Sequence, residues 1–155
     1  MKRDPSLGRV VERMAPGILC RDGFLAPDPR PLEEVLDADR SALSALGISP
    51  EELAAGLRCI YELARAALGT PLPIGALIAT HRDAMGRIPC PWGGCGTFPK
   101  GEAELADPAT GQTLILTALG LHMLAAHGFC GGRGSRFRLD PATAARLLRL
   151  ATPPD

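Results

Sequence analysis

The order of hydrophobic and polar positions divides the chain into a helical first half and a second half that contains strands. Apolar residues recur at helical spacing in residues 7–14, 32–46 and 53–68, which predicts three helices. The clearest start is Ser49-Pro50-Glu51-Glu52, a capping box with proline at the first helical position. Residues 17–31 are rich in proline and contain an Asp-Gly turn, so they are predicted to form a connecting loop.

Shorter patterns follow in the second half. Residues 76–83 begin with an apolar run and then alternate, which predicts a strand. Residues 102–105 and 112–116 have the composition of two more strands, and the turn-rich segment 107–111 joins them. The sequence therefore predicts a β-hairpin over residues 102–116.

Two further helices are expected after this hairpin. Thr117 can cap a helix over residues 118–127, and Gly128 is placed to end it. Asp140-Pro141 can start a last helix, after which residues 152–155 are expected to fray. The pattern predicts a single α+β domain, 1–155, in which a helical hairpin within residues 1–72 packs on a small β-hairpin and helix, followed by a C-terminal helix, within residues 73–155.

Four residues of this second part have the spacing of a metal site. Four residues separate Cys90 from Cys95 and His122 from His127, and 26 residues lie between the two pairs. Two thiolates and two imidazoles form the ligand set of closed, tetrahedral zinc sites. The run Pro91-Trp92-Gly93-Gly94 predicts a tight turn that brings the two sulfurs toward one centre. The sequence therefore predicts that one Zn²⁺ ion is bound here.

A cysteine-bearing turn, a hairpin and a helix, in that order, resemble the ββα unit of Cys2His2 zinc fingers. The resemblance covers roughly a quarter of the chain, at the level of a motif, and the hairpin is longer than in the usual finger. It implies a structural zinc ion. Because His122 and His127 are about 140° apart on an ideal helix, the last turn of this helix is expected to tighten or bulge.

Composition narrows the classes of partner and the compartment. Hydrophobic residues make up 46% of the chain but aromatic residues only 4%, so the core is expected to consist mainly of Leu, Ala, Ile and Val. The 17 basic and 17 acidic residues balance, so the net charge gives no overall electrostatic attraction to nucleic acid or to a membrane surface. The chain shows neither a secretory signal nor an apolar run of bilayer length. It is therefore predicted to be cytoplasmic, with reduced thiols.

A glycine- and arginine-rich loop, residues 131–138, is a second candidate site. Its arginines, with two more in the predicted last helix, are candidate contacts for an anion or for nucleic acid: Arg133, Arg136, Arg138, Arg146 and Arg149. The alternative is an ordered loop whose arginines pair with carboxylates of the same chain. The loop lacks the spacing of a nucleotide-binding P-loop.

Three further interpretations remain open at this level. His81 is either a structural residue of its strand or a fifth ligand or proton carrier. Cys90 and Cys95 can close a disulfide as a redox sensor, although no cation near either thiol in the sequence activates it. An open zinc site with Asp83, Glu102 or Glu104 as the carboxylate base corresponds to a zinc-dependent enzyme.

The preferred interpretation is a zinc-binding, non-catalytic interaction module. Four protein ligands leave no position on the metal for a water molecule, so the ion holds structure rather than performing chemistry. The predicted helix that carries the histidines has no Arg, Lys, Asn or Gln, unlike helices that read DNA bases. A protein partner is therefore predicted, and nucleic-acid binding and zinc-dependent catalysis are the alternatives.

Overall fold

A computed structural model describes residues 5–151. The described part contains five helices: α1 (Pro5–Met14), α2 (Leu32–Ala45), α3 (Pro50–Ala66), α4 (Ala118–His127) and α5 (Pro141–Ala151). It also contains six strands: β1 (Leu72–Ile74), β2 (Leu77–Arg82), β3 (Arg87–Pro89), β4 (Thr97–Pro99), β5 (Glu102–Ala106) and β6 (Thr113–Thr117). The mixture of helix and antiparallel sheet agrees with the predicted α+β class, and the expected fraying of residues 152–155 lies outside the described residues.

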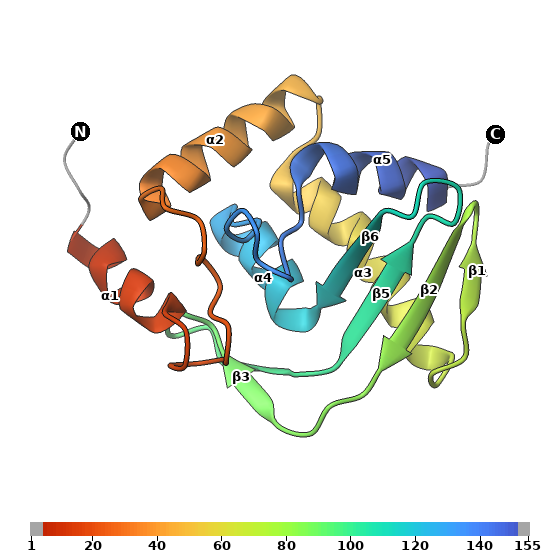
Figure 1. Ribbon diagram of the computed structural model, residues 1–155, viewed down its shortest axis with the longest axis horizontal. Helices are drawn as coiled ribbons and strands as arrows, with labels where there is room; N and C mark the ends of the chain where they lie inside the picture. Colours follow the sequence, from red (N-terminus) through yellow and green to blue (C-terminus); the bar gives the residue numbers. More distant parts are fainter. Residues whose placement is uncertain (1–4, 152–155) are drawn as a thin grey trace.

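The strands form two antiparallel sheets. Four strands pair in the order β1-β2-β5-β6, and β3 pairs with β4 in a separate ribbon. Although β2 and β5 are neighbours in the sheet, residues 83–101 separate them in the sequence and contain the whole β3-β4 ribbon. This excursion carries the ribbon away from the sheet toward α1 (Figure 1).

The main core lies on one face of the four-stranded sheet. Alternate residues of β2, β5 and β6 are buried on that face: Leu77, Ala79, His81, Ala103, Leu105, Leu114 and Leu116. Helix α3 packs across β2, β5 and β6, and α5 contacts β2 and α3. This alternation of buried and exposed positions is what a sheet with one solvated face requires.

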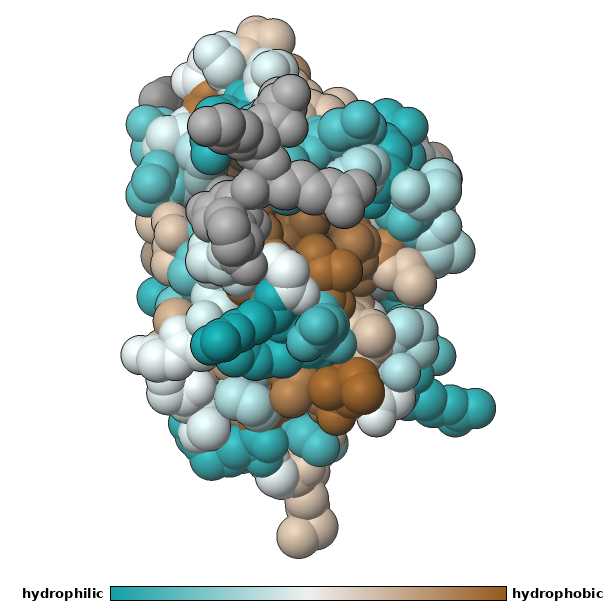
Figure 2. Space-filling view, turned by 90° about the vertical axis from the view of Figure 1, so that its left-hand side faces the viewer, coloured by the Kyte–Doolittle hydropathy of each residue, from teal (hydrophilic) through white to brown (hydrophobic). Residues whose placement is uncertain are grey.

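A second hydrophobic cluster lies under α1 and α2. It joins Val10 and Met14 of α1 to Val35 of α2, Met123 of α4 and Cys90 beside the β3-β4 ribbon. Seen from the α1 side, hydrophobic side chains gather in a hollow near the middle of the face, with hydrophilic side chains around it (Figure 2). The second cluster therefore fixes the ribbon against α4.

Local capping signals are confirmed. The Ser49 hydroxyl accepts a hydrogen bond from the Glu52 N–H at 3.1 Å, and the Thr117 hydroxyl accepts one from the Gly120 N–H at 2.9 Å. The Asp140 carboxylate accepts a bond from the Thr143 N–H at 3.2 Å. Each bond satisfies an N–H group that the first turn of a helix leaves without a partner.

The structure adds features that the sequence pattern did not indicate. Strands β1, β3 and β4 have three residues each, which is too short for a visible alternation. The predicted helical hairpin also differs in detail, because α2 packs mainly against α5. Helix α2 thereby covers the C-terminal part of the chain.

Candidate metal centre

The β3-β4 ribbon brings the two cysteines of the predicted site together. Pro89 pairs with Thr97 in this ribbon, so Cys90 directly follows β3 and Cys95 lies just before β4. The Gly93 N–H donates to the Cys90 carbonyl at 3.0 Å and closes the turn between them. Gly93 has a φ of 80°, a left-handed conformation that glycine adopts without steric cost. The sequence predicted this tight turn but not the two strands that hold it.

Helix α4 supplies the two histidines. The chain remains α-helical through His127 and ends with Gly128 at a φ of 66°, so the helix shows no bulge between the histidines. The centroids of the His122 and His127 rings are nevertheless 5.3 Å apart, and the ring planes meet at an angle of 82°. The length and rotamers of the two side chains, rather than a distorted helix, bring the rings together.

The four predicted ligands converge. One donor atom from each of Cys90, Cys95, His122 and His127 lies within 4.8 Å of the other three. His127 Nε2 is 3.5 Å from Cys90 Sγ and 3.7 Å from Cys95 Sγ. Typical zinc–sulfur and zinc–nitrogen bond lengths place the S and N atoms of a tetrahedral site about 3.6 Å apart. These two distances therefore already match the edges of a metal-centred tetrahedron.

His122 provides an independent test of the fit. Its Nε2 atom is buried and has no hydrogen-bond partner. A buried polar atom without a partner costs free energy, and coordination of this nitrogen to a metal ion would remove that cost. The donor set and this orphaned nitrogen both fit a divalent ion such as zinc.

Aromatic rings hold both histidines in place. Trp92 stacks on His127 with the ring centroids 4.2 Å apart and the planes within 4°. Phe98 of β4 stacks on His122 at 4.6 Å. Such contacts restrict the rotation of the imidazoles and so pre-organise the two nitrogen ligands. Neither ring was predicted to belong to the site, although an isolated tryptophan between two cysteines was a visible signal.

Helix α1 anchors the turn between the cysteines. The Arg13 guanidinium donates to the Pro91 carbonyl at 2.7 Å, across 78 positions of sequence. This contact ties the turn to the second hydrophobic cluster. It was not predictable from the sequence, because nothing in residues 5–14 indicates which distant carbonyl the arginine reaches.

In the absence of a metal ion, burial favours the neutral forms of the Cys90 thiol and of the two imidazoles. Burial raises the pKa of the Cys90 thiol to about 11. Burial also lowers the pKa values of His122 and His127, with smaller contributions from Arg58 and His122 respectively. A raised thiol pKa opposes the redox-sensor interpretation, because the thiolate is the reactive form. A bound cation reverses this preference by stabilising the thiolate.

The arginines of the second candidate site face carboxylates of the same chain. Arg136 forms a bidentate ion pair with Glu102, and Arg138 forms one with Asp39. Arg146 lies 3.1 Å from Asp107. These contacts are those expected of an ordered loop, and the prediction that the arginines bind an anion remains a prediction.

The third arginine of the loop is positioned through its main chain. The Arg133 N–H donates to Asp28 Oδ2 at 3.0 Å, and the Arg30 guanidinium binds the same carboxylate. The hydrogen bonds from Arg30 hold the pKa of Asp28 well below its usual range, against the effect of its burial. Arg133 itself is exposed.

His81 lies outside the group of four ligands. It is 3% exposed, on the core-facing side of β2, with Nδ1 3.5 Å from Asp83 and its ring against the edge of Tyr61. These contacts correspond to the structural alternative for this residue. Within residues 5–151, the only cluster of three or more histidine, cysteine or acidic residues that could hold a metal ion is that of Cys90, Cys95, His122 and His127.

Comparison of this chain with protein families, with curated protein sequences and with solved structures finds no match. No helix in the described part of the chain has both the length and the apolar character needed to cross a bilayer.

Proposed function

We propose that Cys90, Cys95, His122 and His127 hold one Zn²⁺ ion and that the chain is a zinc-stabilised, non-catalytic module that binds another protein. The observation that carries the proposal is the convergence of two sulfur and two nitrogen donors within 4.8 Å. Mixed thiolate and imidazole ligands favour zinc over magnesium or calcium, which take oxygen ligands. The same donor set also binds other transition metals, so the identity of the metal is part of what the experiment tests.

A structural role follows from the number of ligands. With four protein ligands a tetrahedral ion has no open position, so no metal-bound water is available as a nucleophile. The ion instead joins the β3-β4 ribbon to α4. Because the four ligands come from segments that meet only in the folded chain, metal binding is expected to supply part of the free energy of folding.

A protein partner agrees better with the surface than nucleic acid does. Helix α4 cannot enter a DNA groove as finger helices do, since Leu119, Leu121, Met123 and Leu124 are buried. Three of the five candidate arginines are paired with acidic residues. The α1 side exposes hydrophobic surface (Figure 2), and Ile18 is 62% exposed. Exposed apolar surface is a feature of protein-binding faces.

The first experiment is elemental analysis of untagged protein, together with thermal unfolding with and without a chelator. Wild type is expected to contain about one zinc ion per chain and to lose thermal stability when the metal is removed. The variant Cys90→Ser with His122→Ala is expected to contain none. Cys59→Ser is the matched control, because Cys59 is an exposed cysteine of α3 outside the site. Absence of metal from wild type would refute the proposal.

Two additional measurements separate the alternatives. The visible spectrum of the cobalt-substituted protein reports tetrahedral coordination by two thiolates, and a spectrum that changes with added hydroxamate would indicate an open, enzyme-like site. Fluorescence anisotropy with single- and double-stranded oligonucleotides tests the nucleic-acid alternative. Salt-dependent binding that is weakened by Arg133→Glu would favour it over a protein partner.

A further inference from the structure

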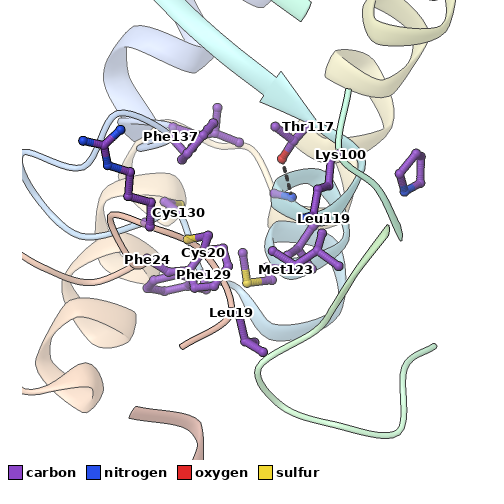
Figure 3. A pocket seen from close by; sticks show the side chains of 16 residues that line it. Leu19, Cys20, Phe24, Lys100, Thr117, Leu119, Met123, Phe129, Cys130 and Phe137 are labelled. Atoms are coloured by element: carbon purple, nitrogen blue, oxygen red, sulfur yellow. Dashed lines mark hydrogen bonds between the residues drawn. The ribbon is translucent and has the colours of Figure 1, made fainter. Parts of the chain in front are cut away.

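An apolar cavity beside α4 is a candidate binding site of its own. Its volume is about 240 Å³, and its walls come from residues 19–24, the β3-β4 ribbon, the start of α4 and residues 129–139. Leu119 and Met123 on α4 face Phe24 and Phe129, with Lys100 on one side and Phe137 on the other (Figure 3). The cavity therefore lies next to the candidate metal centre, on another side of α4.

The chain concentrates its scarce aromatic residues around this cavity. Of its four phenylalanines, Phe24, Phe129 and Phe137 line the cavity. The polarisable side chain of Met123 completes the lining beside them. Small-molecule sites are concave, mostly apolar and rich in aromatic side chains, which is the character of this lining.

The walls are fixed by contacts outside the cavity. The Gly132 N–H donates to the Phe24 carbonyl at 3.0 Å, so the two loops that form one wall are bonded to each other. Gly131 has a φ of +89°, and an added Cβ would lie 2.9 Å from the Arg138 Cα. Arg138 is in turn bound to Asp39 of α2. A ligand thus meets a cavity that is already formed, and little ordering of the protein opposes binding.

The rim of the cavity is positively charged. Arg21 and Lys100 are exposed members of the lining, and none of the lining residues, all in the described part of the chain, is acidic. Neither cation forms an ion pair with another described residue. Two free cations at the mouth of an apolar cavity complement a ligand that has one apolar end and one anionic end.

The size of the cavity limits the apolar end. A volume of about 240 Å³ corresponds to that of about eight water molecules in the liquid. It accommodates an unbranched chain of about eight carbons and is smaller than the clefts of about 300–1,000 Å³ that hold drug-sized ligands.

From the shape, lining and rim charge, we propose that this cavity binds a free medium-chain carboxylate. Its hydrocarbon chain lies between Leu119, Met123 and the phenylalanines, and its carboxylate lies at the mouth near Arg21 and Lys100. This site is distinct from the metal centre and does not depend on the proposed zinc-stabilised function.

The test is a titration of the full-length, metal-loaded protein with octanoate, followed by NMR of ¹³C-methyl-labelled methionine. The Met123 methyl group reports the cavity, and Met85, which is 95% exposed and outside the lining, is the internal control. Met123→Leu assigns the signal. A saturable shift at Met123, with no shift at Met85, is expected. No shift at Met123, or equal shifts at both methionines, would overturn the proposal.

Variants of the ligand and of the protein separate the contribution of the two cations to binding from that of the apolar cavity. Octanoate is expected to bind roughly five- to tenfold more tightly than 1-octanol, because two exposed ion pairs each contribute modestly. Arg21→Ser with Lys100→Ser is expected to abolish this preference without weakening octanol binding, whereas Arg149→Ser, a change to an exposed arginine of α5, retains it. Cys20→Trp, which fills the cavity from its wall, is expected to block both ligands. Equal affinity of wild type for the two ligands would refute the anionic specificity.

Discussion

Removal of Arg138 tests whether this arginine is a structural residue or an anion-binding residue. The Asp39 side chain is 5% exposed and that of Arg138 12% exposed. Both side-chain hydrogen bonds of Asp39 come from the Arg138 guanidinium, at 2.9 and 3.0 Å. Arg138→Leu therefore leaves a buried carboxylate without these hydrogen bonds.

The expected loss is large because the remaining charge cannot reach water. Breaking a buried ion pair by removing one partner costs about 3–5 kcal/mol, and Arg138 also gives up its bond of 2.7 Å to the Gly131 carbonyl. The double variant Asp39→Leu with Arg138→Leu is expected to be more stable than Arg138→Leu alone, since no isolated charge remains. The difference between the double variant and the sum of the single variants measures the coupling.

Urea unfolding at neutral pH is the assay, with the free energy extrapolated to water. The exposed Arg149→Leu is the control and is expected to change stability by no more than about 0.5 kcal/mol. If Arg138 instead serves a bound anion, Arg138→Leu would leave stability unchanged. A loss below about 1 kcal/mol, or additive single changes, would refute the reasoning, because a buried pair of this kind must show coupling.

Three further predictions follow from the metal centre and the loops. Because burial raises the pKa of Cys90 to about 11, zinc must displace the thiol proton, and the apparent zinc affinity is expected to rise by about tenfold per pH unit for each proton released. Calorimetry in buffers of different ionisation enthalpy counts those protons. An affinity that does not change with pH would contradict the assignment of Cys90 as a ligand. The pKa of Asp28 is held below its usual range by its ion pair, so its contribution to stability is present above the ordinary carboxyl pKa and is lost as the pH falls toward the folded-state value. Asp28→Asn should therefore destabilise the protein more at neutral pH than at about pH 3, and equal losses in urea unfolding at both would argue against this ion pair. In Gly132→Ala the added methyl group overlaps the Leu25 carbonyl oxygen, whereas in Gly111→Ala it meets open space and costs only about 1 kcal/mol of backbone strain. The melting temperature should therefore fall much further in Gly132→Ala than in Gly111→Ala. Similar melting temperatures of the two variants would contradict the close approach of the loops.

Features that depend on near neighbours in the sequence were predictable. The capping box at Ser49, the Thr117 cap and the Asp140 cap each involve a side chain and an N–H group three residues later. The hairpin of β5 and β6 was predictable from two strand-like runs, the second of them alternating, joined by one turn. Paired spacing also pointed to Cys90, Cys95, His122 and His127 as candidate ligands, and the structure brings one donor atom of each within 4.8 Å of the other three.

Features that depend on distant neighbours were decided only by the tertiary structure. The pairing of β2 with β5 bypasses the β3-β4 ribbon, and no local pattern shows which strands meet across such an excursion. The contacts of Trp92 with His127 and of Arg13 with Pro91 likewise join separate segments. The arginines of the loop after α4 were ambiguous in the sequence, because their acidic partners lie far along the chain.

The cavity illustrates the same limit most clearly. Its walls come from four separate parts of the chain. Each part alone has the sequence of an ordinary loop, ribbon or helix and does not indicate a cavity. Sequence periodicity reports which residues avoid water, since hydrophobic burial has no preferred direction and requires no particular partner. Which buried side chains meet, and where they leave space unfilled, depends on shape complementarity between whole elements. The sequence by itself therefore determined the helices, the hairpin and the four candidate metal ligands, whereas packing between distant segments decided the second sheet, the ion pairs and the cavity.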